Sequence, residues 1–211
     1  KTITVDEGTK VLIWKIEETL DWLVKDIELT DHCQDRVVGM KSEIHQRGFM
    51  SIRHLFAEMG YTDHDLYYDE NGKPHLKDGK YISITHSFNF TAIIISKDEV
   101  GIDIEKQRDK ILKIAEKFTP LKEYHTLANE EALIRKLTIV WGAKESIYKL
   151  YSQSGLGFLQ HINITDFDFD DKKTTGKVYF KGKNSNYNLE FLEFEGFTCV
   201  YAKLNKVAVK K

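Results

Sequence analysis

The 211-residue chain has few cysteines, few prolines and almost no net charge. Its two cysteines, Cys33 and Cys199, lie far apart without a CxxC or histidine-spaced partner, which argues against a disulfide framework and a zinc site. Only two prolines in a chain that is 41% hydrophobic exclude intrinsic disorder. Because the chain has 31 basic and 33 acidic residues, it has no net positive charge that would attract nucleic acid or an anionic membrane.

Long hydrophobic runs are also absent. The longest unbroken apolar run, around residues 92–95, is far shorter than the roughly 18 residues that a membrane-spanning helix needs. The first seven residues contain no apolar segment of the kind found in secretory signals. We therefore expect a cytoplasmic protein that binds neither membranes nor nucleic acids.

The chain shows no short repeat and no flexible linker rich in proline, glycine or serine. Apolar spacing predicts a helical face from Ile16 to Ile27, a helix ended by Gly60, a short helix near Pro120, and a long helix from Asn129 to about Tyr151. Alternation predicts strands over 11–16, 81–86, 91–96 and 100–105, and an antiparallel sheet over 161–203. Since helices and strands mix without regular βαβ crossovers, we expect an α+β fold.

The first candidate site is the segment 101–105. On a strand, residues two apart share a face, so Asp103 and Glu105 point one way while the two isoleucines between and before them point the other way. Two carboxylates on one face repel each other unless a cation lies between them, and such oxygen ligands suit magnesium. The alternative is an ordinary solvated strand face.

The second candidate lies on the predicted long helix. An apolar stripe runs along it at helical spacing, formed by Leu133, Leu137, Val140, Ile147 and Tyr151. Trp141, Glu145 and Lys149 follow at i, i+4 and i+8 along the edge of this stripe. Lys144 projects from its middle, where an unpaired ammonium is costly, so we expect anions to meet it. The alternative for Glu145 and Lys149 is a surface ion pair.

The third candidate joins the turn at 71–74 to the strand at 83–87. A lysine, hydroxyls and an imidazole near strand ends can build a phosphate site. Taken singly, these residues favour a plain turn and a satisfied strand-end histidine. No HExxH pair and no GxSxG elbow supports a zinc protease or a serine triad.

In chain order these segments read NGKP (71–74), SITHS (83–87), VGIDIE (100–105) and WGAKESIYKLY (141–151). Their series resembles the signature of the 4′-phosphopantetheinyl transferases, specifically the two-lobed surfactin-synthetase-activating type. The resemblance departs from the family pattern at residues 118–123, where the acid Glu123 is displaced by one position and receives no role.

The resemblance implies a pseudo-dimer of two similar α/β lobes, with the active site in the cleft between them. It places the N-terminal lobe, on the coenzyme A side, at residues 1–99 and the C-terminal catalytic lobe at 100–211. The implied reaction transfers the 4′-phosphopantetheine arm of coenzyme A to a serine of an apo carrier protein (acyl, polyketide or peptidyl) and releases 3′,5′-ADP. A chain that holds both lobes is expected to be a monomer.

The resemblance also implies roles for individual residues. Asp103, Glu105 and Glu145 would hold Mg²⁺, and Lys149 would be a catalytic contact of the pyrophosphate. We expect Glu145 to serve also as the base for the carrier serine, because it lies at the rim of the buried stripe. The resemblance implies that Lys73 and Pro74 line the adenine side of coenzyme A and that Thr85 and His86 together meet its 3′-phosphate. The other residues expected to contact coenzyme A are Lys144, Arg47 and Arg53.

Two other functions compete with this interpretation. A coenzyme A-binding module without catalysis would keep the binding residues, although all three acids and Lys149 are present. A metal-dependent phosphodiesterase of the D…(D/E)xK type fails on spacing, because Gln107 stands where its lysine should be.

Overall fold

A computed structural model describes residues 2–120 and 129–205. Its contacts divide the chain into two compact units, Lys1–Asp98 and Glu99–Lys211. Helices and strands are mixed in both units, which confirms the α+β class. The functional roles of the two lobes remain predictions. Among the described residues, no helix combines the length and apolar character needed to cross a membrane.

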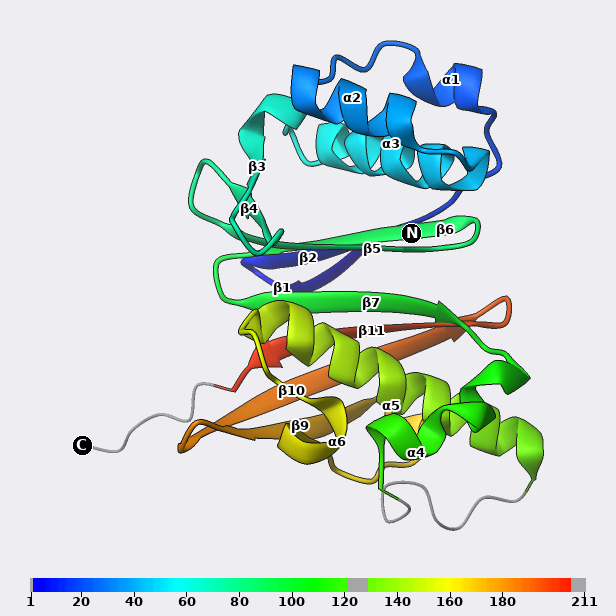
Figure 1. Ribbon diagram of the computed structural model, residues 1–211, viewed down its shortest axis with the longest axis vertical. Coiled ribbons are helices and arrows are strands. Elements are labelled where there is room, and N and C mark those ends of the chain that lie inside the picture. The colour runs from blue at the N-terminus through cyan, green and yellow to red at the C-terminus, as the bar shows by residue number, and fades with distance from the viewer. Residues whose placement is uncertain (1, 121–128, 206–211) are drawn as a thin grey trace. The chain divides into compact units, whose positions relative to one another are not determined.

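The first unit is an antiparallel sheet with its helices on one side (Figure 1). The sheet has the order β1-β2-β6-β5, with β1 at Thr2–Asp6, β2 at Thr9–Lys15, β5 at Tyr81–Ser87 and β6 at Phe90–Ser96. The helices are α1 (Leu20–Val24), α2 (Asp31–Gly39) and α3 (Glu43–Glu58). A 3₁₀ turn, η1 (Asp63–Asp65), leads to a small hairpin of β3 (Leu66–Tyr68) and β4 (Pro74–Leu76). Ile52, Leu55 and Phe56 of α3 pack on the isoleucines of β5 and β6.

The helices before α3 differ from the sequence prediction. The helical face expected from Ile16 to Ile27 contains only the five residues of α1. The Thr19 side chain caps this helix by accepting the N–H of Trp22, and Asp26, with φ of 62°, stops it in the left-handed region. Ile16 instead donates its N–H to the Asn89 carbonyl. The helix ended by Gly60 is confirmed as α3.

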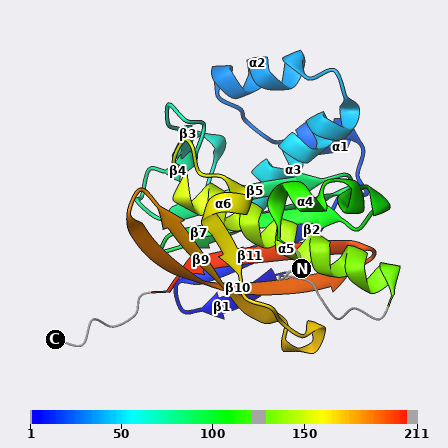
Figure 2. The same ribbon diagram turned by 60° about the horizontal axis from the view of Figure 1, so that its bottom comes forward.

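The second unit is a five-stranded antiparallel sheet in the order β7-β11-β10-β9-β8, crossed by one long helix (Figure 2). Its strands are β7 (Val100–Lys106), β8 (Ile162–Ile164), β9 (Lys173–Phe180), β10 (Lys183–Phe194) and β11 (Phe197–Leu204). Its helices are α4 (Ala115–Phe118), α5 (Glu130–Tyr151) and α6 (Phe158–His161), with 3₁₀ turns η2 (Asp109–Lys113) and η4 (Phe169–Asp171). Asn129 caps α5 as predicted, by accepting the N–H of Ala132 at 2.9 Å.

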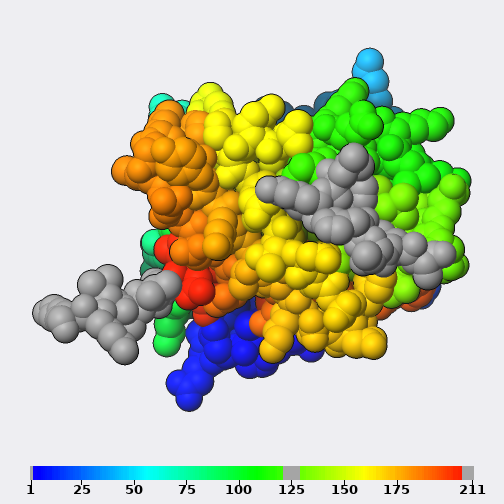
Figure 3. All heavy atoms as spheres, turned by 90° about the horizontal axis from the view of Figure 1, so that it is seen from below, coloured from blue at the N-terminus to red at the C-terminus, as the bar shows by residue number. Residues whose placement is uncertain are grey.

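The core of the second unit lies between α5 and the sheet. Leu137 and Ile147 of α5 belong to the same buried cluster as Phe191 and Val200 of the central strands. The space-filling view shows the segment around α6 (yellow) packed beside the β9–β10 hairpin (orange) (Figure 3). The helix predicted near Pro120 and the residue Glu123 lie outside the described residues.

The two units have the same order of strand connections. In the first, β2 is followed by α3 and later by the hairpin of β5 and β6, whose last strand pairs with β2. In the second, β7 is followed by α5 and later by the hairpin of β10 and β11, whose last strand pairs with β7. In the first unit β6 therefore lies between β2 and β5, and in the second unit β11 lies between β7 and β10.

Candidate functional site

The two strand acids lie on the face of β7 that α5 covers. Asp103 pairs in register with Val200 and Glu105 with Thr198 on the neighbouring strand. A Cβ built on Gly142 of α5 would lie 2.9 Å from Val200 and 3.8 Å from Oδ2 of Asp103, so the helix passes directly over this part of the sheet. Asp103 is buried and Glu105 is half-buried.

Gly101, in the same strand, allows this close approach. A Cβ at position 101 would lie 1.9 Å from the carbonyl oxygen of Ser146 on α5, a distance that no real side chain can adopt. The Ser146 hydroxyl in turn donates to the carbonyls of Gly142 and Val200, at 2.7 and 2.9 Å. Helix and strand are thus held backbone to backbone beside the acids.

Glu145 and Lys149 approach the strand acids from α5. The Lys149 ammonium lies 2.7 Å from Oδ1 of Asp103 and donates to the Ile102 carbonyl at 3.0 Å. Glu145 and Lys149 are both half-buried, as expected for the edge of the apolar stripe. One strand and one helix therefore bring together the three acids and the lysine.

Burial and mutual repulsion change the acidity of two of these carboxyls. Burial, then the charge of Asp103, raises the pKa of Glu145 to about 7, and Glu105 adds to the rise while Lys149 opposes it. Burial and the charge of Asp103 also raise the pKa of Glu105, although a hydrogen bond from the Trp141 side chain opposes this. The three acids thus share one electrostatic field, which disfavours their full ionisation.

A metal centre is not assembled by these side chains alone. Within residues 2–120 and 129–205, no group of three or more His, Cys, Asp or Glu side chains is arranged to hold a metal ion. The donor chemistry is nevertheless of the kind that magnesium takes, since all three groups are carboxylates.

Lys144 has surroundings that differ from the sequence prediction. It is fully buried. Its ammonium donates to the carbonyls of Phe118 and Ile162 at 2.7 Å and of Phe158 at 3.2 Å. Main-chain carbonyls accept hydrogen bonds from this ammonium, whereas the sequence prediction expected anions. These bonds tie α5 to the segments around α4 and α6, which favours a structural role for Lys144.

The remaining predicted residues belong to the first unit. Lys73 and Pro74 lie in the β3–β4 hairpin, both half-buried. On β5, Ile82 and Ile84 face the α3 core, and His86 continues on that side against Gly48. Because successive strand residues alternate, the Thr85 side chain points to the opposite face. The prediction that Thr85 and His86 meet one phosphate together conflicts with this alternation.

His86 lies beside a second histidine, which comes from the start of α3. Its ring centroid lies 6.0 Å from that of His45 in the first turn of α3. Arg47, two residues later, donates to the Ile16 carbonyl at 3.3 Å, and Ile16 bonds to the β5–β6 turn at Asn89. Nε of Arg47 is buried and has no hydrogen-bond partner within the described part of the chain. Sequence reasoning missed His45, because a lone histidine at a helix start carries no signal.

Arg53, also predicted to contact coenzyme A, is buried in the first unit. It forms a salt bridge with Asp63 at 2.9 Å and donates to the Phe49 carbonyl and the Cys33 sulfur. These contacts engage the Arg53 guanidinium inside the first unit, which favours a structural role over contact with coenzyme A.

Comparison with known proteins identifies relatives of this chain. Residues 99–203 match the family model of the 4′-phosphopantetheinyl transferase superfamily. The 4′-phosphopantetheinyl transferase gsp of Aneurinibacillus migulanus is 31% identical over 152 residues, covering 70% of this chain and 62% of the relative. Enterobactin synthase component D of Salmonella typhi is 30% identical over 128 residues, covering 59% of this chain and 54% of the relative. The chain spans less than two thirds of the length of these relatives.

Proposed function

Because the chain belongs to the 4′-phosphopantetheinyl transferase superfamily, we propose that it transfers the 4′-phosphopantetheine arm of coenzyme A to a serine of an apo carrier protein. The serine oxygen forms a bond to the β-phosphorus, the bond from that phosphorus to the bridging oxygen breaks, and 3′,5′-ADP leaves. The observation that supports this best is the group of Asp103, Glu105, Glu145 and Lys149, which β7 and α5 bring together inside the matched segment.

Asp103, Glu105 and Glu145 would hold magnesium. Burial and then mutual repulsion raise the pKa values of the two glutamates, and a divalent cation would relieve the repulsion. Bound magnesium supplies neutralisation of the pyrophosphate charge.

Lys149 and Glu145 would act on the reacting groups. Lys149 already directs its ammonium to the acids, and the same donor would contact the pyrophosphate as charge moves to the departing ADP. Glu145 would accept the proton of the carrier serine, whose hydroxyl is a poor nucleophile at neutral pH. Both residues lie at the half-buried edge of α5, where a substrate can reach them.

The adenosine end of coenzyme A would bind residues of the first unit. We assign the 3′-phosphate to His86, with His45 as a neighbouring imidazole. Arg47 stays a proposed contact of coenzyme A, because its Nε has no hydrogen-bond partner within the described part of the chain. Lys73 and Pro74 would contact the adenine. Thr85, Lys144 and Arg53 receive no role in this binding.

The test incubates the protein with coenzyme A, magnesium and several apo carrier proteins and measures the carrier mass. A mass gain equal to one phosphopantetheine arm is expected on at least one carrier. Coenzyme A binding without any gain would favour the non-catalytic module. Dephospho-coenzyme A is expected to bind more weakly than coenzyme A, and equal affinity would remove the proposed phosphate site.

A further inference from the structure

The hairpin that carries Lys73 and Pro74 has little support from its own strands. β3 and β4 have three residues each and form a sheet of only two strands, which is marginally stable in water. Tyr68 pairs with Pro74, a residue without an N–H to donate to a ladder. Leu66 and Leu76 anchor the hairpin in the core, and contacts within the turn are left to fix Lys73 and Pro74 at its tip.

Asp69 provides these contacts at the start of the turn. Its carboxylate oxygen Oδ1 accepts the N–H groups of Asn71 and Lys73, both at 2.9 Å. Its backbone N–H donates to the Lys73 carbonyl at 3.0 Å, and its carbonyl accepts the N–H of Gly72 at 2.9 Å. Gly72 closes the turn with φ of 79°, where glycine is favoured. One residue thus bonds to three of the four that follow it.

The same carboxylate also fixes the far side of Pro74. Its second oxygen, Oδ2, lies 3.0 Å from Nε2 of His75. The His75 ring stacks on Tyr67, with centroids 5.3 Å apart and planes 20° apart. Hydrogen bonds from His75 and from the Lys73 N–H lower the pKa of Asp69, so it stays ionised at neutral pH. The Asp69 carboxylate therefore bonds to the backbone of Lys73 on one side of Pro74 and to the side chain of His75 on the other side.

We propose that Asp69 and His75 are positioning residues that hold Lys73 and Pro74 in the arrangement that binds the adenine of coenzyme A. The inference rests on the proposed function. An acidic side chain is a poor partner for an anionic ligand, so Asp69 acts through the turn and not by contact. A turn ordered before the ligand arrives loses less conformational entropy when the ligand binds.

The test measures the Kd of coenzyme A, of 3′,5′-ADP and of 4′-phosphopantetheine by calorimetry or competition. Asp69→Ala is expected to weaken coenzyme A and 3′,5′-ADP by roughly tenfold, since it removes the acceptor of several hydrogen bonds. Binding of 4′-phosphopantetheine, which has no adenine, is expected to stay unchanged, as is kcat at saturating coenzyme A. Asp69→Asn keeps an acceptor oxygen and should recover most of the affinity.

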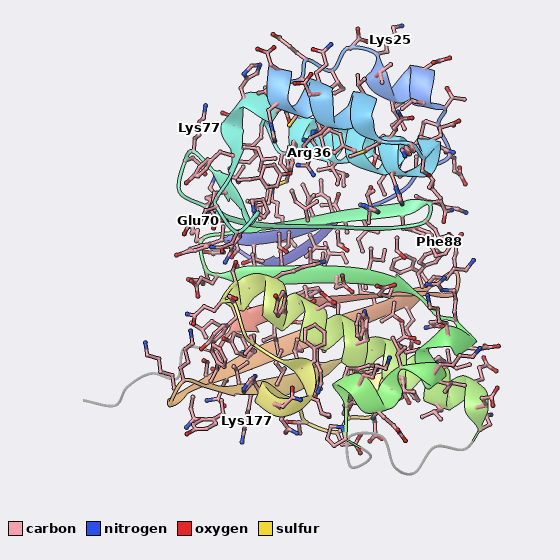
Figure 4. All side chains as sticks on the ribbon, viewed as in Figure 1. Lys25, Arg36, Glu70, Lys77, Phe88 and Lys177 are labelled. Carbon is pink, nitrogen blue, oxygen red and sulfur yellow. The ribbon has the colours of Figure 1, made fainter. Side chains whose placement is uncertain are left out.

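Two further variants make the result decisive. His75→Phe keeps an aromatic ring against Tyr67 but removes the hydrogen bond, and should weaken the same two ligands by roughly threefold, whether or not Asp69→Ala folds. Glu70→Ala is the matched control, because Glu70 is an exposed acid in the same turn (Figure 4). If wild-type protein binds no coenzyme A, the proposed function fails. If it binds, and the Asp69 and His75 variants bind equally well or lose all three ligands alike, the positioning role is overturned.

Discussion

Glu145 has two proposed roles that a pair of substitutions can separate. Glu145→Gln keeps the shape and one ligand oxygen but removes the charge and the basicity, whereas Asp103→Asn removes a charge and leaves the proposed base. We expect high magnesium to restore transfer by Asp103→Asn, while Glu145→Gln stays down by the ~10²–10⁴-fold that general bases contribute. Transfer rates over a magnesium titration test this, and equal rescue of both variants would leave Glu145 as a ligand only.

Lys144 gives a prediction about stability. Its fully buried ammonium satisfies carbonyls from three segments, so Lys144→Met should lower the free energy of unfolding by about 2–5 kcal/mol. The Kd of coenzyme A for the folded variant should not change. Urea denaturation with Lys177→Met, an exposed lysine on β9 (Figure 4), supplies the comparison. A variant of normal stability that binds coenzyme A weakly would return Lys144 to the binding site.

At the residue scale, sequence patterns identify acids better than their partners. Alternation along the strand places Asp103 and Glu105 on one face, and the structure agrees. The carbonyls that receive Lys144 come from residues 26, 14 and 18 positions away, and main-chain acceptors leave no trace in residue types. The sequence could therefore show that this lysine needs partners but not which ones.

Gly101 allows α5 to pack closely against β7. Because a Cβ there would overlap the Ser146 backbone, Gly101→Ala must push β7 and α5 apart. We expect the free energy of unfolding to fall by at least about 1–3 kcal/mol and transfer activity to fall as the acids move away from Lys149. Gly39→Ala is the control, since a Cβ at Gly39 meets nothing within 4 Å. A fully active and stable Gly101→Ala protein would contradict this packing.

The pair of Asp63 and Arg53 makes the first unit sensitive to acid. Burial raises the pKa of Asp63, but the Thr30 N–H bond and the Arg53 charge outweigh burial and leave it below the usual 3.8. A lowered carboxyl pKa stabilises the fold above pH 3.8 and loses this effect as the pH falls through the folded value. We therefore expect the free energy of unfolding to drop steeply with acid below about pH 4.

Asp63→Asn should reduce that acid dependence and cost about 3–5 kcal/mol at pH 7, because Arg53 is left buried without its counter-charge. Trp14 and Trp22 lie in the first unit, so their fluorescence in a Trp141→Phe background reports its unfolding from pH 3 to 7. Identical slopes for wild type and variant in this range would contradict the role of the pair.

Element prediction succeeded where capping and periodicity agree. The long helix α5 has both Asn129 as its cap and a full apolar stripe, and its bounds match. By contrast, α2 has only Cys33 buried among its nine residues, so it has no apolar stripe from which the sequence could predict it. The spacing from Ile16 to Ile27 suggested one helix, but backbone conformation at Asp26 ends it early.

For the whole molecule we expect a monomer. Both groups of proposed site residues are present in one chain, so no second copy is needed to supply either of them. Sedimentation velocity at micromolar concentration measures this directly. An obligate trimer would mean that a neighbouring copy contributes to the site.

The insertion of the last strand beside β7 has a consequence for synthesis of the protein. β7 carries two of the three acids, and in the sheet it pairs with β11, which begins at Phe197. Until the ribosome has translated β11, β7 lacks the strand with which it pairs. During that time Asp103 and Glu105 have no fixed position. A chain interrupted before Phe197 would consequently carry the motif residues without the proposed site, so we expect prematurely terminated products to lack the proposed transfer activity.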